Sequence, residues 1–271
     1  MRSVDDIKFV ALGGGSSIGG SSYLVKTGLT TVMFDCGIDP DSDPIHTFNN
    51  FLSRALKSGL ITTLNDINAV ILSHAHTDHS GLLPALFKII SEDPKIIRPP
   101  RFYAHLATIH LLELIFDNIR KFTQNIPYET YWSERLLREE GNLVEPYDGL
   151  IDWAHPELGT LHFYKNSHLL GAVMTEIEVN GKVIIYTGDF QIGETPTLPA
   201  SEMPKSRPDL LILDGTNAVS MSSRIVSGWK QGQKQLWELL DQLLSTKSKL
   251  LLPSFALGRS QDILALILKF I

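Results

Sequence analysis

Four side chains that commonly bind metal ions lie within six consecutive residues of this chain, directly after an apolar run. Residues 68–72 form that run and predict a buried strand, while residues 82–90 have the pattern of a helix. The predicted loop between them carries His74, His76, Asp78 and His79. Imidazole and carboxylate ligands suit Zn²⁺ or a similar divalent ion. A solvated histidine-rich loop is the alternative, but this spacing at a strand end favours a metal site.

Three more polar residues follow apolar runs in the same way, and they are Asp35, His168 and Asp189. Each one alone is as well explained by a turn residue or by a capped or buried polar group. All three nevertheless share the strand-end position of the histidine-rich segment. We therefore interpret them together with that segment as one constellation.

The apolar pattern predicts two β-rich blocks, each accompanied by helices. In the first block we expect strands at residues 7–12, 23–26, 30–34 and 68–72 and helices at 48–58, 79–90, 107–122 and 130–139. In the second we expect strands at 160–166, 173–179, 182–187, 209–213 and 249–252 and helices at 226–244 and 258–271. Asn180-Gly181 predicts a type I′ hairpin turn. The expected fold is α+β, a four-layer αββα sandwich with its loops gathered at one edge.

Composition restricts the class of protein without identifying it. The chain has 271 residues, 43% hydrophobic and 20% charged, which is enough for a large core in one or two domains. Its one cysteine, Cys36, excludes an internal disulfide and fits a reducing compartment. The sequence has no secretory signal and no apolar run of membrane-spanning length, so we expect a soluble, cytoplasmic protein without a membrane partner. A formal charge of −6 argues mildly against autonomous, tight nucleic-acid binding.

On these residues the sequence resembles the metallo-β-lactamase superfamily, whose hallmark is His-x-His-x-Asp-His followed by a later histidine and a later aspartate. Further segments resemble the β-CASP branch of RNA-processing nucleases, in particular the endonuclease subunit of mRNA 3′-end processing and its prokaryotic relatives. The matching segments are 35–37, 168–172, 186–190 and 253–262. The resemblance implies a metallo-β-lactamase-like domain at 1–252 and the start of a β-CASP insertion at 253–271, with the remainder absent.

The resemblance also implies how the metal ligands are shared between two ions. One Zn²⁺ would be bound by His74, His76 and His168. Part of a second site would come from Asp78 and His79, and Asp189 would bridge the two ions. Two such ions can share a hydroxide and clamp a phosphodiester for in-line attack.

Four aspartates are expected to take part in catalysis, and two of them, Asp35 and Asp214, are not expected to bind a metal ion directly. Asp35 would orient a metal ligand, and Asp214 would partner a histidine that protonates the leaving oxygen. Gly215 departs from the family pattern, which has a hydroxyl residue there. The partner histidine and a last ligand of the second ion are expected beyond residue 271. A fragment would therefore bind one Zn²⁺ better than two and cleave poorly, and a complete chain would be a degenerate member.

The expected function is a zinc-dependent phosphodiesterase that cleaves RNA, with single-stranded RNA as substrate. A non-catalytic scaffold within an RNA-processing assembly is one alternative, and the intact metal ligands argue against it. A metallo-hydrolase of small esters or thioesters is another, and residues 258–261, which resemble the nuclease branch alone, argue against that. A second copy of the chain or the subunits of a processing complex are the expected protein partners.

Overall fold

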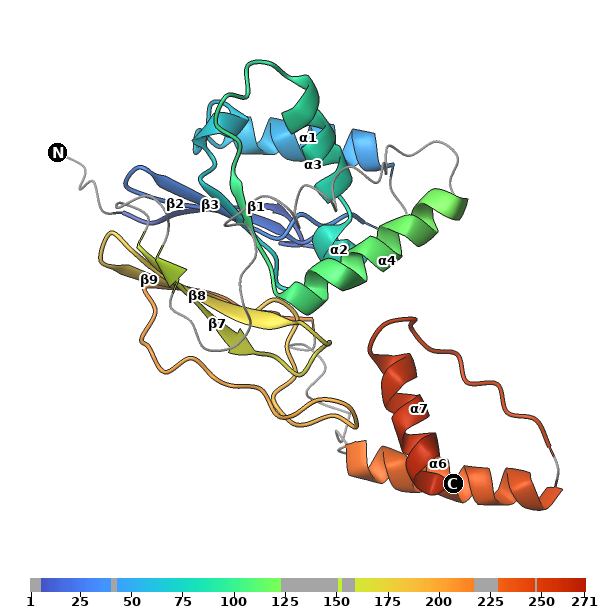
Figure 1. Ribbon diagram of the computed structural model, residues 1–271. Helices are drawn as coiled ribbons and strands as arrows, with labels where there is room; N and C mark the ends of the chain where they lie inside the picture. The colour runs from blue at the N-terminus through green and yellow to red at the C-terminus, as the bar shows by residue number, and fades with distance from the viewer. Residues whose placement is uncertain (1–5, 40–42, 123–150, 153–158, 217–228, 247) are drawn as a thin grey trace.

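The computed structural model describes residues 6–39, 43–122, 151–152, 159–216, 229–246 and 248–271 (Figure 1). Two five-stranded sheets lie face to face, in the orders β1-β2-β3-β4-β5 and β10-β9-β8-β7-β6. The first sheet consists of β1 (Lys8–Gly13), β2 (Ser22–Thr27), β3 (Thr30–Phe34), β4 (Ala69–Ile71) and β5 (Arg101–Tyr103). The second consists of β6 (Ile151–Asp152), β7 (Thr160–Lys165), β8 (Val173–Val179), β9 (Lys182–Tyr186) and β10 (Leu210–Ile212).

Helices cover the outer face of the first sheet (Figure 1). In chain order the helices are α1 (Pro44–Lys57), the 3₁₀ turn η1 (Leu64–Asp66), α2 (Thr77–Ser80), α3 (Leu83–Glu92), α4 (Leu106–Phe122), α6 (Trp229–Thr246) and α7 (Arg259–Phe270). The last two pack against each other at the lower right of Figure 1, and the Trp237 indole donates to the Leu266 carbonyl at 3.1 Å. No helix in these described ranges is both long and apolar enough to cross a membrane.

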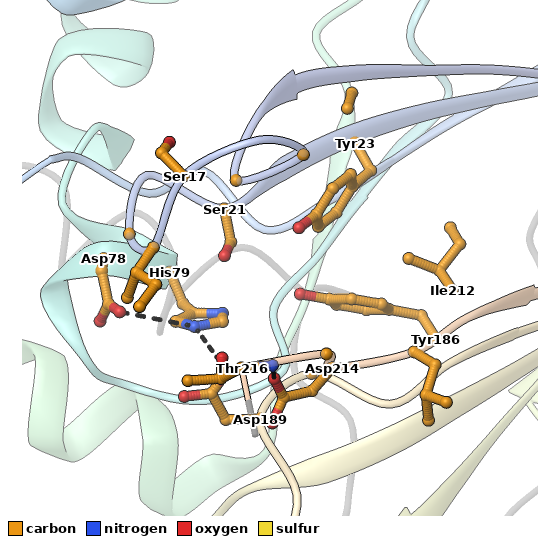
Figure 2. A pocket seen from close by; sticks show the side chains of 18 of the residues that line it. Ser17, Ser21, Tyr23, Asp78, His79, Tyr186, Asp189, Ile212, Asp214 and Thr216 are labelled. Carbon is orange, nitrogen blue, oxygen red and sulfur yellow. Dashed lines mark hydrogen bonds and ion pairs between the residues drawn. The ribbon is translucent and has the colours of Figure 1, made fainter. Parts of the chain in front are cut away.

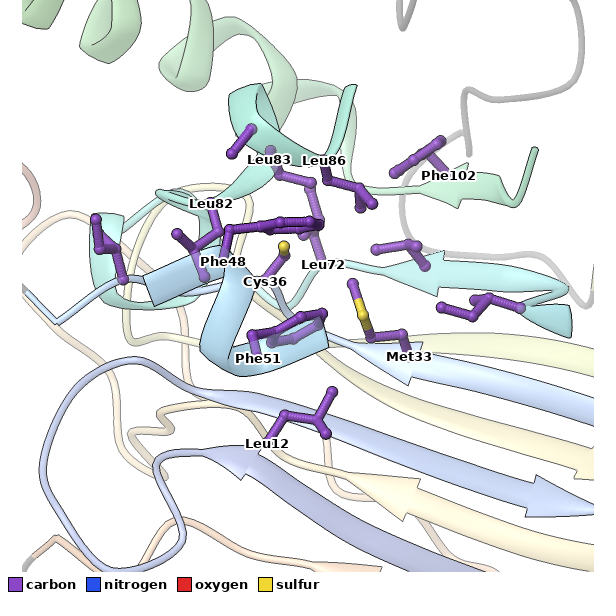
Figure 3. Close-up of a cluster of buried hydrophobic side chains, with 14 of the residues drawn as sticks. Leu12, Met33, Cys36, Phe48, Phe51, Leu72, Leu82, Leu83, Leu86 and Phe102 are labelled. Carbon is purple, nitrogen blue, oxygen red and sulfur yellow. The ribbon is translucent and has the colours of Figure 1, made fainter. Parts of the chain in front are cut away.

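The buried side chains form two layers, one on each face of the first sheet. Successive side chains of a strand point to opposite faces, so Met33 packs among the helices while Phe34 packs against the second sheet. The helical layer includes Phe48 and Leu86 (Figure 3). The layer between the sheets includes Tyr186 from β9. The central strand β3 is buried at all five positions, and its last three residues are apolar.

The α+β sandwich expected from the sequence is confirmed. The ranges that the structure describes supply three of its layers, which are the helices over the first sheet and the two sheets themselves. The expected strands 30–34 and 173–179 are confirmed to the residue. Asn180 and Gly181 have φ values of 54° and 69°, as the expected type I′ turn requires.

Three segments differ from what the sequence predicted. The metal-ligand segment is not all loop, because Thr77–Ser80 forms the one-turn helix α2, and the helix expected at 79–90 is therefore two helices. The strand expected to be buried at 209–213 is the edge strand β10, and Leu211 and Leu213 are half exposed. No strand forms at 249–252, where the leucines find no neighbouring strand among the described residues and stay exposed. The helix expected at 130–139 lies outside the described residues.

The direction of the strands explains why the polar residues that follow them lie close together. β3 and β4 are parallel, so the segments that follow Phe34 and Ile71 leave the first sheet at the same edge. β9 and β10 are also parallel, which brings the segments after Tyr186 and Ile212 together at one edge of the second sheet. The carboxyl ends of parallel strands lie at the same end of their sheet, and the loops that follow them there carry the candidate site.

Gly37 determines how closely the segment after β3 approaches α2. A Cβ at this position would collide with the carbonyl oxygen of Asp78, and the Gly37 amide already donates to the Ser21 carbonyl at 2.9 Å. We therefore expect Gly37→Ala to lower the free energy of unfolding by about 1–3 kcal/mol through overpacking. Gly193 has open space around it, so Gly193→Ala is the matched control and should change stability little. Denaturant titration of the metal-free proteins measures both, and equal stabilities of the two variants would contradict the prediction.

Candidate metal centre

Three imidazole rings lie close together in the loops that follow the carboxyl ends of the strands. The Nε2 atom of His74 lies 3.0 Å from Nδ1 of His76, and Nε2 of His168 lies 3.2 Å from the same Nδ1 atom. A tetrahedral zinc ion with Zn–N bonds near 2.05 Å requires its nitrogen ligands to be about 3.3 Å apart. Both distances to His76 are close to that value, and the three ligand atoms all lie within 4.8 Å of one another, so the group could hold one zinc ion.

A second group of potential ligands shares His74 and adds His79 and Asp189. The Nε2 atom of His79 lies 3.2 Å from Oδ1 of Asp189, and the other oxygen of Asp189 lies 3.8 Å from Nε2 of His168. Asp189 thus faces both groups, which is the position expected of a bridging ligand. Asp78 lies at the rim, with its Oδ2 atom 3.8 Å from Nε2 of His79.

Burial keeps the first three imidazoles neutral. It lowers the pKa of His74 well below 6.5, and the neighbouring imidazoles lower that pKa further. Burial likewise lowers the pKa of His76, and it lowers the pKa of His168 to about 4. A neutral imidazole has a free lone pair on one ring nitrogen, which is the form that binds a metal ion.

His79 differs because carboxylates surround it. Burial alone would lower the pKa of His79, but Asp35 and Asp189 outweigh burial and raise the pKa to about 10. Burial would raise the pKa of Asp189, yet the facing His79 lowers it. Without a metal, a proton on His79 supplies the positive charge between these carboxylates. A divalent cation beside Nε2 would take over that role.

The carboxylate of Asp35 holds the neighbouring segments together from beneath the site. It is fully buried and accepts hydrogen bonds from the Ser73 amide at 2.7 Å, from the Ser73 hydroxyl at 2.7 Å, from Nδ1 of His79 at 2.7 Å and from the Tyr186 hydroxyl. Because Nδ1 of His79 donates to Asp35, its Nε2 atom is directed toward the site. Asp35 has a φ of 56°, a left-handed conformation that non-glycine residues rarely adopt.

Ser73 sets the tautomer of His74 in the same way. Its hydroxyl has one proton and donates it to Asp35, so the contact of 2.9 Å with Nδ1 of His74 requires the imidazole to be the donor. The lone pair of His74 is then on Nε2, which faces His76. Ser73 and the Tyr186 hydroxyl were not expected from the sequence to have this role. The only available signal was their position at strand ends beside the motif residues.

A cavity of about 760 Å³ opens beside the metal ligands (Figure 2). Asp78, His79, Asp189 and Asp214 all line it. The Asp214 backbone amide donates to the Thr187 hydroxyl at 3.1 Å, which holds the segment after β10 against the segment after β9. The structure therefore brings all eight expected site residues to one edge, with Asp35 beneath the ligands and Asp214 on the cavity wall.

The two-sheet sandwich and the histidine-aspartate donor set at its edge define a class of metal-binding proteins. A sequence profile described as "Metallo-beta-lactamase superfamily" matches residues 17–220. The chain belongs to this superfamily.

Several curated proteins are similar to the chain over nearly its whole length. Integrator complex subunit 11 of Danio rerio is 29% identical over 98% of this chain and 42% of that protein. The transcription termination factor FttA of Methanosarcina mazei is 28% identical over 95% of this chain and 38% of that protein. Endoribonuclease YSH1 of Yarrowia lipolytica is 28% identical over 97% of this chain and 30% of that protein. The expected resemblance to the β-CASP RNA-processing branch is confirmed, and the chain spans about 30–42% of the length of these relatives.

Removal of the Ser73 hydroxyl tests whether it orients His74. In Ser73→Ala the Nδ1 atom of His74 loses its partner, so we expect the dissociation constant for Zn²⁺ to rise about 10–100-fold. Competition with a chromophoric chelator measures this constant. Ser91→Ala is the control, because Ser91 is exposed near the end of α3 and its hydroxyl donates to the Lys88 carbonyl, away from the metal ligands. Unchanged zinc affinity in Ser73→Ala would show that the hydroxyl does not orient the ligand.

Proposed function

We propose that this chain forms the metal-binding domain of a zinc-dependent phosphodiesterase that acts on RNA. The observation that carries the proposal is the position of Asp189, which faces both the three-histidine group and His79. A carboxylate between two groups of ligands suits a pair of ions. The relative named as an endoribonuclease supports RNA as the substrate.

Zinc ions bound there would activate a water molecule and neutralise the negative charge of a phosphodiester. The residues of the chain have distinct roles around that chemistry. His74, His76 and His168 supply neutral nitrogen ligands. Asp35 keeps His79 oriented, and Asp214 lies on the cavity wall where it could partner a proton donor to the leaving oxygen.

We further propose that the metallo-β-lactamase-like domain comprises residues 1–252 and that residues 253–271 begin a β-CASP insertion. Leu257 packs against the helical core, and its backbone lies within hydrogen-bonding reach of His76. Arg259 is close enough to His168 to lower the pKa of that imidazole, after burial and the neighbouring imidazoles. The start of the insertion would therefore form one wall of the metal centre.

The proposed substrate is single-stranded RNA, and the proposed partners are a second copy of the chain or subunits of an RNA-processing complex. The names of two relatives, an Integrator complex subunit and a cleavage and polyadenylation specificity factor subunit, support an assembly. Zinc is the proposed metal because three imidazoles with tetrahedral spacing favour it. The cytoplasm remains the proposed location.

Cleavage of a labelled single-stranded RNA in the presence of Zn²⁺ tests this function. We expect chelator-sensitive cleavage, and we expect His76→Ala to lower the rate at least about 100-fold because it removes a ligand of the first ion. His110→Ala is the matched control, since the His110 side chain is 58% exposed on α4. Zinc binding without any hydrolysis would favour a scaffold instead. Faster hydrolysis of a thioester than of RNA would favour a small-molecule hydrolase.

A further inference from the structure

The cavity beside the metal ligands extends to an aromatic pair that the proposed chemistry does not use. Figure 2 shows Tyr23 toward one end of the cavity and Asp78, His79 and Asp189 toward the other. Phe9 lines the same cavity and stacks on Tyr23, with ring centroids 6.0 Å apart and planes inclined by 18°. The aromatic pair is thus continuous with the metal centre through one open space.

The position of the pair in the sheet explains why it is uncovered. Phe9 pairs with Val25 across β1 and β2, which makes Tyr23 its diagonal neighbour on the face toward the second sheet. Val25 is covered by the second sheet, but Phe9 on the edge strand β1 is 45% exposed. An exposed aromatic side chain that lines a cavity is typical of a binding surface.

The charge of the cavity restricts what it can bind. Its described lining contains the carboxylates of Asp78, Asp189 and Asp214 and neither lysine nor arginine. A phosphate group would therefore be repelled everywhere except at metal ions bound among the ligands. Apart from His79 at the metal-ligand end, the remaining polar groups are neutral, since they come from hydroxyls such as those of Ser17 and Ser21 and from the glycine-rich turn at residues 14–19. The space away from the metal ligands suits a flat, uncharged group with hydrogen-bonding edges.

We propose that this cavity binds the nucleoside next to the phosphodiester at the metal centre, with its base against Phe9 and Tyr23. The inference rests on the proposed function, because a phosphodiester held by the metal ions must carry a nucleoside into the adjoining space. Stacking on an aromatic ring depends little on which base is present, so the subsite should accept all four bases. The cavity volume of about 760 Å³ lies within the range of small-molecule sites.

The test measures binding of a fluorescent single-stranded oligoribonucleotide to the zinc-loaded protein by anisotropy, over a time in which a gel shows the RNA intact. We expect Phe9→Ala to weaken binding about 10-fold, and Phe9→Trp to bind as the wild type does. Leu29→Ala is the control, because Leu29 is an exposed apolar residue in the β2–β3 turn at the other end of β2. Thermal melting verifies that each variant is folded.

A set of oligonucleotides with one abasic site each, moved along the strand, separates stacking from other effects of the substitution. With the abasic site at one position of the strand, the wild type should bind the oligonucleotide about 10-fold more weakly than the intact RNA. Phe9→Ala should bind both equally, because the missing base and the missing ring remove the same contact. The inference is overturned if Phe9→Ala binds intact RNA as tightly as the wild type, or if every abasic effect is the same in both proteins. Failure of the proposed function is a different result, namely absence of chelator-sensitive RNA cleavage by the wild type.

Discussion

The buried carboxylate of Asp35 is the interaction on which the rest of the site depends. Its hydrogen-bond donors come from the segment after β4, from α2 and from β9, so one side chain joins elements of both sheets and the short helix α2. A buried carboxylate without partners would cost several kcal/mol, so these donors and the fold stabilise each other. The orientation of His79 and the tautomer of His74 then follow from the same packing that holds the sheets together.

The edges of the two sheets determine where a substrate could enter. β1 and β10 are both edge strands, and the cavity lies between residues of these strands and the metal ligands. The interior strands β3 and β4 cannot provide such space, since both of their faces are packed. The strand order therefore places the candidate metal ligands beside the packed central strands and the cavity beside the edge strands.

The sequence predicted the central strands well because β3 and β8 are defined by their own apolar pattern and by adjacent turns. It failed where the outcome depends on a neighbour. Residues 249–252 have the composition of a strand, but they pair with no strand among the described residues, and strand composition alone does not make a strand. Residues 77–80 look like loop, yet backbone bonds from His79 and Ser80 to the His76 carbonyl close a helical turn.

The sequence by itself determined the chemistry of the ligands and their location at strand ends, since residue type and apolar periodicity are local properties. Only the tertiary structure decided which atoms face one another. Asp189 lies between His79 and His168, and Ser73 lies between Asp35 and His74, through contacts that join segments far apart in the chain. The cavity at Phe9 likewise cannot be predicted from the sequence, because residues of β1, α2 and β10, which are far apart in the chain, line it together.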